Sequence, residues 1–211
     1  MNRTDRLSKG LKQSYYTIFH PVNGFDAVKW ENAGSIKSCL LIAFLFFLVN
    51  VFDAELVGFI FNMRDPDRIS ILSIFAVSIG GILLWFIANC AVSSLMFTEG
   101  KAKHIFILTC YSLLPYIAWE FCYIIASNFV ASDMEPFLKM LQFMGLTWSF
   151  LLLVFGTYQI HQVTVGKVFI IIVLTAIGVL IMLFLMLLAY SLIQQMYIFA
   201  YTLFSEIVFR L

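Results

Sequence analysis

Charged residues are scarce in this sequence of 211 residues, and their scarcity excludes most classes of protein. Only 12% of the residues are charged and 62% are hydrophobic. A soluble domain has roughly 25% charged and 45–50% apolar residues. Disorder is excluded as well, because it requires low hydrophobicity and a high net charge. A formal net charge of +1 argues against nucleic-acid binding. The composition therefore predicts an integral membrane protein whose surroundings are a lipid bilayer.

The sequence also lacks the short motifs that carry catalysis or bind cofactors. It contains no Gly-x-Ser-x-Gly elbow, no Walker loop, no dinucleotide fingerprint and no His-Glu-x-x-His zinc motif. The four cysteines, Cys39, Cys90, Cys110 and Cys122, all lie within apolar runs and suit neither a disulfide framework nor a metal site. The polar beginning of the chain lacks the apolar region of a cleavable signal peptide. We therefore expect no enzymatic activity and no cofactor.

What the sequence has in abundance is long apolar runs. Five of them cover residues 36–52, 69–97, 104–130, 137–160 and 168–193. A membrane helix needs about 20 apolar residues, and residues 56–61 prolong the first and shortest run. The links 98–103 and 161–167 are short, which makes successive helices antiparallel neighbours. The sequence predicts an all-α integral membrane protein with a five-helix transmembrane bundle over residues 36–193.

The two ends of the chain differ in character from the bundle. Residues 1–35 mix aromatic and charged side chains, which suits a cytoplasmic or interfacial segment in the lipid headgroup layer, with a short helix over 25–30. No Gly or Pro occurs between Gly178 and Leu211, so the last span can continue as a helix beyond the membrane. Polar residues of the tail share one helical face. We expect residues 194–211 to form an amphipathic tail helix, in the interface or packed over the bundle. The alternative is a sixth crossing.

Lysine and arginine are distributed unevenly between the two sides of the predicted bundle. If the N-terminus is cytoplasmic, nine basic residues lie on that side: Arg3, Arg6, Lys9, Lys12, Lys29, Lys37, Lys101, Lys103 and Lys167. Four lie on the other side: Arg64, Arg68, Lys139 and Arg210. Cytoplasmic loops carry the excess of basic residues. We therefore predict a multi-pass protein of the cytoplasmic membrane with a cytoplasmic N-terminus, and five spans place the C-terminus outside.

The third apolar run contains the most informative polar residues. Spacings of three and four place six of them on one face of a single helix: Thr109, Ser112, Tyr116, Glu120, Tyr123 and Ser127. Pro115 lies within this helix and should kink it. Glu120 is the only acidic residue well inside a span, and such a residue is a functional candidate by default. The six residues either line a proton or ligand path or hold helices together by hydrogen bonds.

Three histidines lie on the predicted cytoplasmic side, namely His20, His104 and His161. Three imidazoles can bind zinc with one open position. However, these residues lack the local spacing of a zinc motif, and histidines beside lipid headgroups need no metal. We expect no metal site, with these three residues as the weak alternative.

Several motifs resemble those of the Yip1 domain family, in its short bacterial (Firmicutes-type) branch. The similarity includes a His-Pro-x-x-Gly-Phe-Asp-x-x-Lys-Trp-Glu segment over 20–31, a Glu-Gly-Lys loop over 99–101 and a Leu-Leu-Pro-Tyr segment over 113–116. The family-like positions are His20, Pro21, Gly24, Trp30, Gly100 and Pro115. The resemblance implies five membrane helices, a cytoplasmic N-terminus and no known catalytic activity.

Together these features predict a non-enzymatic multi-pass membrane protein. The links are too short for a catalytic domain, and no nucleophile or metal motif is present. We expect a scaffold, a membrane-organising factor or a transporter-accessory subunit, whose partners are the lipid bilayer and other membrane proteins such as a transport complex. The alternative is a small transporter or channel that uses Glu120 and the polar face around it.

Overall fold

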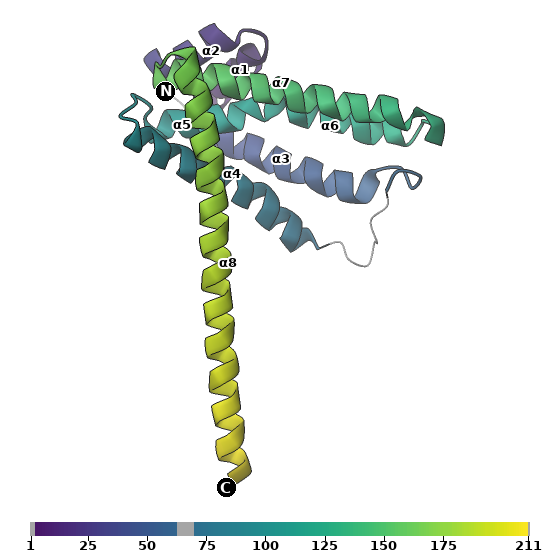
Figure 1. Ribbon diagram of the computed structural model, residues 1–211. Coiled ribbons are helices and arrows are strands. Elements are labelled where there is room, and N and C mark those ends of the chain that lie inside the picture. The colour runs from purple at the N-terminus through teal and green to yellow at the C-terminus, as the bar shows by residue number, and fades with distance from the viewer. Residues whose placement is uncertain (1–2, 63–69, 211) are drawn as a thin grey trace.

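The computed structural model describes residues 3–62 and 70–210, and this part of the chain is helical apart from short turns. Its elements are α1 (Arg3–Phe19), α2 (Pro21–Trp30), α3 (Ile36–Leu56), α4 (Ile71–Leu95), α5 (Ala102–Ser112), α6 (Leu114–Ser127), the short 3-10 helix η2 (Ser132–Met134), α7 (Glu135–His161) and α8 (Val165–Arg210). Figure 1 shows α3, α6 and α7 running side by side, with α8 crossing the bundle and extending away from it. Arg64 and Arg68, which the sequence places on the side opposite the N-terminus, lie outside the described residues.

Five segments are long and apolar enough to cross a membrane, which confirms the predicted all-α fold with five spans. They are Ile36–Leu56, Ile71–Leu95, Ala102–Ser127, Ser132–His161 and Val165–Glu206. Apolar side chains on the outside of the bundle remain exposed, as on Leu40 and Phe44 of α3, since lipid replaces water around them. The chain is a multi-pass membrane protein.

The third span is broken near its middle, as the presence of Pro115 predicts. Leu113 ends α5 and begins α6, and Pro115 occupies the first turn of α6. A proline ring has no N–H and clashes with the carbonyl of the residue four positions earlier. The backbone N–H of Tyr116 is released by this break and donates to the Ser149 Oγ of α7 at 2.9 Å. The kink is therefore stabilised by a neighbouring helix.

The N-terminal segment forms two helices that lie against one end of the bundle. The predicted short helix over 25–30 is confirmed and begins earlier, at Pro21. Helix α1 was not predicted, although Leu7, Leu11 and Ile18 recur at helical spacing and are half-buried beside Gly10, Ser14 and Thr17. The Tyr111 hydroxyl donates to the Gly10 carbonyl at 2.9 Å and joins α1 to α5.

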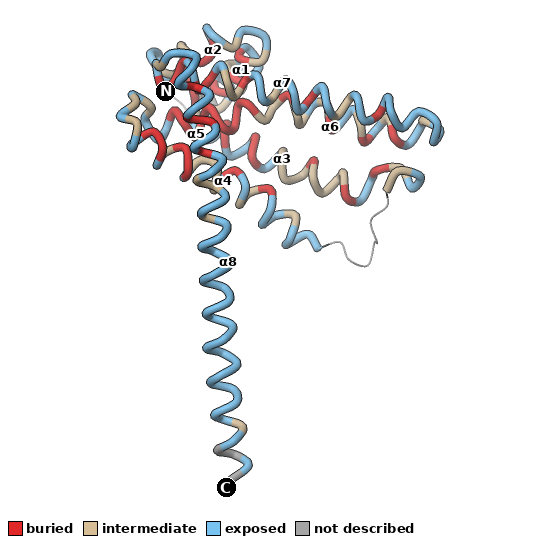
Figure 2. Tube along the Cα trace, viewed as in Figure 1, coloured by how far each residue is buried: buried red, intermediate tan, exposed pale blue. Residues whose placement is uncertain are grey.

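The best-buried part of the protein lies where α2, α3, α5 and α7 meet, beside these N-terminal helices (Figure 2). Fully buried members of this core include Phe25, Ile42, Leu108, Leu152 and Ile160. Cys39 and Cys110 belong to it and carry free thiols, as small hydrophobic residues do. The packed end of the molecule is thus the end that carries the basic segments.

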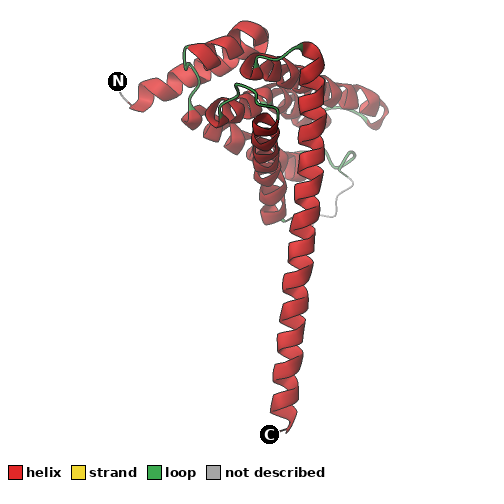
Figure 3. Cartoon of the chain, turned by 60° about the vertical axis from the view of Figure 1, so that its left-hand side comes forward, coloured by secondary structure: helices red, strands yellow, loops and turns green. Residues whose placement is uncertain are grey.

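Helix α8 is continuous over 46 residues, about 69 Å at roughly 1.5 Å per residue. Its first turns bury Val168, Ile171 and Thr175, and Gly178 faces Ala88 of α4. Every residue from 183 to 204 is exposed, and Figures 2 and 3 show this half projecting from the bundle. The predicted tail is helical, but residues 194–210 continue α8 rather than forming a separate helix packed over the bundle. Without Gly or Pro, nothing in the backbone ends the helix.

Candidate functional site

Buried polar side chains gather in two places, at the basic end of the bundle and within the membrane-spanning part. At the basic end, Asn89, Ser93, Thr98 and His161 form a connected group that we call the His161 cluster. Within the spans, Glu120 of α6 meets Gln142 of α7. Both groups join residues that are far apart in the sequence.

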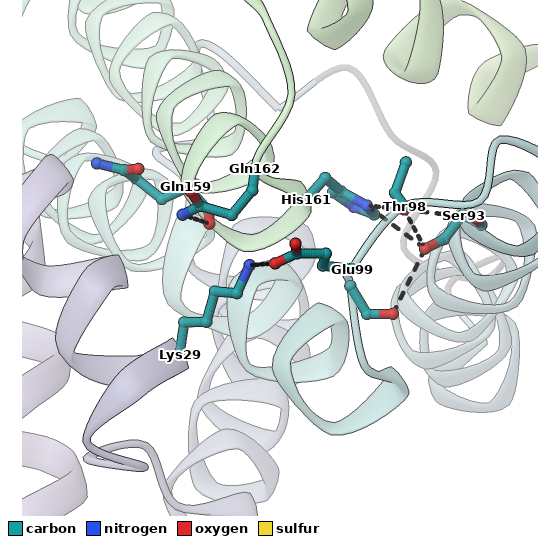
Figure 4. A network of polar contacts seen from close by, with 8 residues as sticks. Lys29, Ser93, Thr98, Glu99, Gln159, His161 and Gln162 are labelled. Atoms are coloured by element: carbon teal, nitrogen blue, oxygen red, sulfur yellow. Dashed lines mark hydrogen bonds and ion pairs between the residues drawn. The ribbon is translucent and has the colours of Figure 1, made fainter.

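The His161 cluster is a chain of hydrogen bonds centred on a buried imidazole (Figure 4). His161 is 1% exposed and ends α7, where Gln162 adopts a left-handed backbone conformation with φ of 51°. Its Nε2 donates to the Asn89 Oδ1 at 3.1 Å. Its Nδ1 lies 2.8 Å from the Thr98 Oγ1. Both ring nitrogens are therefore hydrogen-bonded, one to α4 and one to the loop after it.

The chain of bonds continues from Thr98 into α4. The Ser93 Oγ lies 2.6 Å from the Thr98 Oγ1, and the two hydroxyls share a hydrogen bond. A hydroxyl bonded to a histidine is also the arrangement of a nucleophile and its general base. Here Ser93 and His161 are 4% and 1% exposed, so both side chains are buried among their hydrogen-bond partners. The bonds instead connect α4, the loop after it and the end of α7.

Two family-like glycines are explained by close packing around this end. A Cβ on Gly100 would lie 2.8 Å from the His161 Nδ1 and 3.2 Å from the Ser93 Oγ. A Cβ on Gly24 would lie 2.6 Å from the Thr17 Oγ1, so only glycine lets α2 approach α1 this closely. Gly100 therefore makes room for the His161 cluster.

The other family-like positions have different surroundings. Pro21 begins α2, and Pro115 begins α6 after the kink. His20 is exposed and stacks on Tyr16, with ring centroids 4.6 Å apart. Trp30 is 67% exposed, which suits a side chain at the level of lipid headgroups.

Polar contacts bind α2 to the rest of this end. The Lys29 Nζ lies 2.9 Å from the Glu99 Oε2, and the Lys29 side chain is only 7% exposed (Figure 4). The Gln159 Nε2 donates to the Asp26 Oδ2 at 3.3 Å. The N-terminal segment, the 98–101 loop and the end of α7 thus lie on the same side of the bundle, as the predicted topology requires.

Glu120 is 2% exposed and lies within the third span, as predicted. The Gln142 Nε2 donates to its Oε1 at 2.8 Å. Glu120 lies seven residues before the end of α6, about 10 Å along the helix. Sequence reasoning missed Gln142, although its polar side chain interrupts the fourth apolar run. The carboxyl group therefore sits between two helices and has a bonded neighbour.

The six polar residues of the third span lie on both sides of the kink. The break at Leu113 leaves Thr109 and Ser112 on α5 and the other four on α6. The hydroxyls of Thr109, Ser112 and Ser127 donate to carbonyls of their own helices. Ser127 also accepts from the Gly58 N–H at 3.0 Å, which joins α6 to the end of α3.

The three histidines lie in different surroundings. His20 is exposed, His161 belongs to the cluster, and His104 is 5% exposed with no hydrogen-bond partner for its Nδ1. Within residues 3–62 and 70–210, no three His, Cys, Asp or Glu side chains are grouped so that they could hold a metal ion.

Comparison with known proteins agrees with the fold and with the family-like positions. A search of curated proteins and a search of solved structures gave no match. A family model described as the Yip1 domain matches residues 15–202, from the end of α1 to the last turns of α8. This match covers most of the 211 residues, and the chain therefore belongs to the Yip1 domain family.

Proposed function

We propose that this protein is a non-enzymatic membrane protein that acts as a scaffold, a membrane-organising factor or a transporter-accessory subunit. One observation supports this most directly: the buried polar groups bond to each other across helices. Glu120 is bonded by Gln142, and His161 is bonded by Thr98 and Asn89. Hydrogen bonds of this kind hold the helices of a membrane bundle together.

The second half of α8 supports an interaction role. Residues 183–204 are exposed, and they include large apolar side chains such as Leu187, Phe199 and Phe204. No described part of the chain covers them. A helix of this length is about twice as long as the hydrocarbon layer is thick, so α8 offers a long apolar surface to lipid or to another membrane protein.

We place the protein in the cytoplasmic membrane with its N-terminus in the cytoplasm. The basic residues of α1, α2 and the 98–103 loop lie at the same end of the bundle, where Lys29 contacts Glu99 and Lys103 contacts Asn32. This grouping supports the orientation that the excess of basic residues predicts.

The experiment that tests this function is purification of the full chain from its native membranes in a mild detergent. The proposal expects a defined membrane protein, such as a transport subunit, to copurify, and the reverse capture with that partner to recover this chain. A variant with Leu187→Lys and Phe199→Lys should lose the partner if α8 holds it. A matched variant with Val77→Lys and Leu72→Lys, on the exposed face of α4, should keep it. Recovery of the chain alone under all conditions would contradict the proposal.

A small transporter or channel is the second candidate. Its supporting observation is the burial of an acidic side chain, Glu120, inside a span. This candidate predicts ion or proton flux through the purified protein in liposomes, and loss of that flux in Glu120→Gln. Equal flux in the variant and the unmodified chain would remove Glu120 from such a mechanism.

A further inference from the structure

A cavity of about 1030 Å³ lies between α1 and the beginnings of two spans, on the side of the molecule that carries the basic segments. We call it the basic pocket. Its wall includes residues of α1, of the link between α2 and α3, and of the first turns of α3 and α5: Lys9, Lys12, Tyr16, Asn32, Lys37 and Lys103. The pocket is separate from the His161 cluster and from Glu120.

The basic pocket carries an excess of positive charge. Four of its lining residues are lysines, and Glu31 is the single acidic residue among them, which leaves a formal charge of +3. Lys103 donates to the Asn32 Oδ1 at 3.2 Å, a neutral acceptor. The ion pairs formed among the described residues involve Lys29 and Lys139, not the lysines of the pocket. The pocket therefore favours an anionic ligand.

The beginning of helix α3 adds to this preference. Helix α3 begins at the pocket, and the side chain of its N-cap residue, Ser35, makes no capping hydrogen bond. The first N–H groups of a helix and its dipole favour phosphate and other anions. Lysine charge and the beginning of α3 thus act together on the same ligand.

The position of the pocket suits a lipid rather than a small soluble anion. Ile36 is 48% exposed, lines the pocket and opens the first span, and Leu40 continues the exposed apolar face one turn further into the membrane. Tyr16 on α1 forms part of the opposite wall and is 42% exposed. Tyrosine and lysine at the start of a span lie at the level of the headgroups.

We propose that the basic pocket binds the phosphate of an anionic phospholipid, with the headgroup between the lysines and an acyl chain along the exposed face of α3. The ligand chemistry is that of a phosphate group, and the lipid supplies it together with the apolar chain. This site goes beyond the proposed scaffold role and does not depend on it. A cytoplasmic leaflet rich in anionic lipids would fill such a site.

The test compares binding of phosphatidylglycerol and phosphatidylcholine to the full chain in detergent micelles, by native mass spectrometry. The unmodified chain should prefer phosphatidylglycerol. Lys37→Gln combined with Lys103→Gln should weaken that preference roughly tenfold or more, because each lysine contributes to the attraction. Lys37→Arg combined with Lys103→Arg preserves the charge and should keep the preference, which separates loss of binding from loss of folding.

The matched control is Lys101→Gln combined with Lys167→Gln. These two lysines are exposed at the same end of the bundle and are absent from the pocket wall, so the charge change is identical. The control should retain the preference for phosphatidylglycerol. If both double substitutions weaken the preference for phosphatidylglycerol equally, the lipid is attracted by diffuse surface charge and the proposal is wrong. Displacement of the lipid by an equal concentration of inorganic phosphate would also overturn it, since the pocket would then recognise free phosphate.

Discussion

At the scale of single residues, several polar side chains inside this protein are paired across helices. His161 is hydrogen-bonded to Thr98 and to Asn89, and Glu120 accepts from Gln142. A buried polar group without a partner costs about 1–3 kcal/mol, so each of these pairs matters for stability. The stability cost of a substitution should therefore depend on which buried hydrogen-bond partner it leaves without a bond.

The Glu120–Gln142 pair gives a prediction that distinguishes the effect of the hydrogen bond from the effect of burying each side chain. Glu120→Leu removes the acceptor of the Gln142 amide and should lower the free energy of unfolding by about 1–3 kcal/mol. The double variant with Gln142→Leu removes both partners and should cost less than the sum of the two single changes. Thermal unfolding in detergent measures this coupling. Strictly additive losses would show that the two side chains do not stabilise each other.

Gly100 gives a second prediction at this scale. A methyl group there would press against the His161 ring, so Gly100→Ala should destabilise the protein by about 1–3 kcal/mol. Gly80 is the matched control, because a Cβ on it meets nothing within 4 Å. Gly80→Ala lies inside a helix and should leave the melting temperature unchanged or raise it. Equal melting temperatures for Gly100→Ala and Gly80→Ala would contradict the close packing around Gly100.

At the scale of elements, the third span is two helices joined at a proline, and the neighbouring span supports the joint. Pro115 prevents a continuous hydrogen-bond ladder, and the released N–H of Tyr116 finds Ser149 on α7. The divided helix also separates Thr109 and Ser112 from Glu120.

The joint can be tested with a pair of changes. Ser149→Ala leaves the N–H of Tyr116 without its acceptor and should cost about 1–3 kcal/mol in the free energy of unfolding. In a Pro115→Ala background the helix can restore its own ladder, so the same change should cost less. Circular dichroism during thermal unfolding of the four proteins provides the measurement. An identical cost in both backgrounds would contradict a proline-dependent role for Ser149.

The sequence was sufficient to predict the spans and the kink, because both depend on local properties. Apolar runs locate membrane helices, and Pro115 interrupts one wherever the rest of the chain lies. Helix α1 was missed although the sequence carries a signal for it, because Leu7, Leu11 and Ile18 recur at helical spacing and are half-buried. Gln142 was also missed as the partner of Glu120, and Asn89 approaches His161 only after the helices pack.

At the scale of the whole molecule, the packed core and the basic residues share one end, whereas α8 projects from the bundle (Figures 1 and 2). The first turns of α8 bury Val168 and Ile171, but residues 183–204 pack against nothing in the described chain. The molecule thus combines a well-packed end, in which polar groups are bonded, with a long apolar surface. That combination is consistent with the proposed interaction role.

The topology gives a further prediction. Five spans place the two ends of the chain on opposite sides of the membrane. With a cytoplasmic N-terminus, a tag at the N-terminus should be protected from external protease in intact cells. A tag at the C-terminus should be digested. Permeabilised cells, in which both tags are digested, are the control. Protection of both tags in intact cells would contradict the five-span topology and support a sixth crossing by α8.

The most direct measurement of the central claim is ion and proton flux through the purified full chain in liposomes. If the buried polar groups serve only to hold helices together, flux should equal that of protein-free liposomes across a proton gradient or an ion gradient. Glu120→Gln should then behave like the unmodified chain. Flux that rises with the amount of protein and disappears in Glu120→Gln would contradict the account and make the third span a transport path.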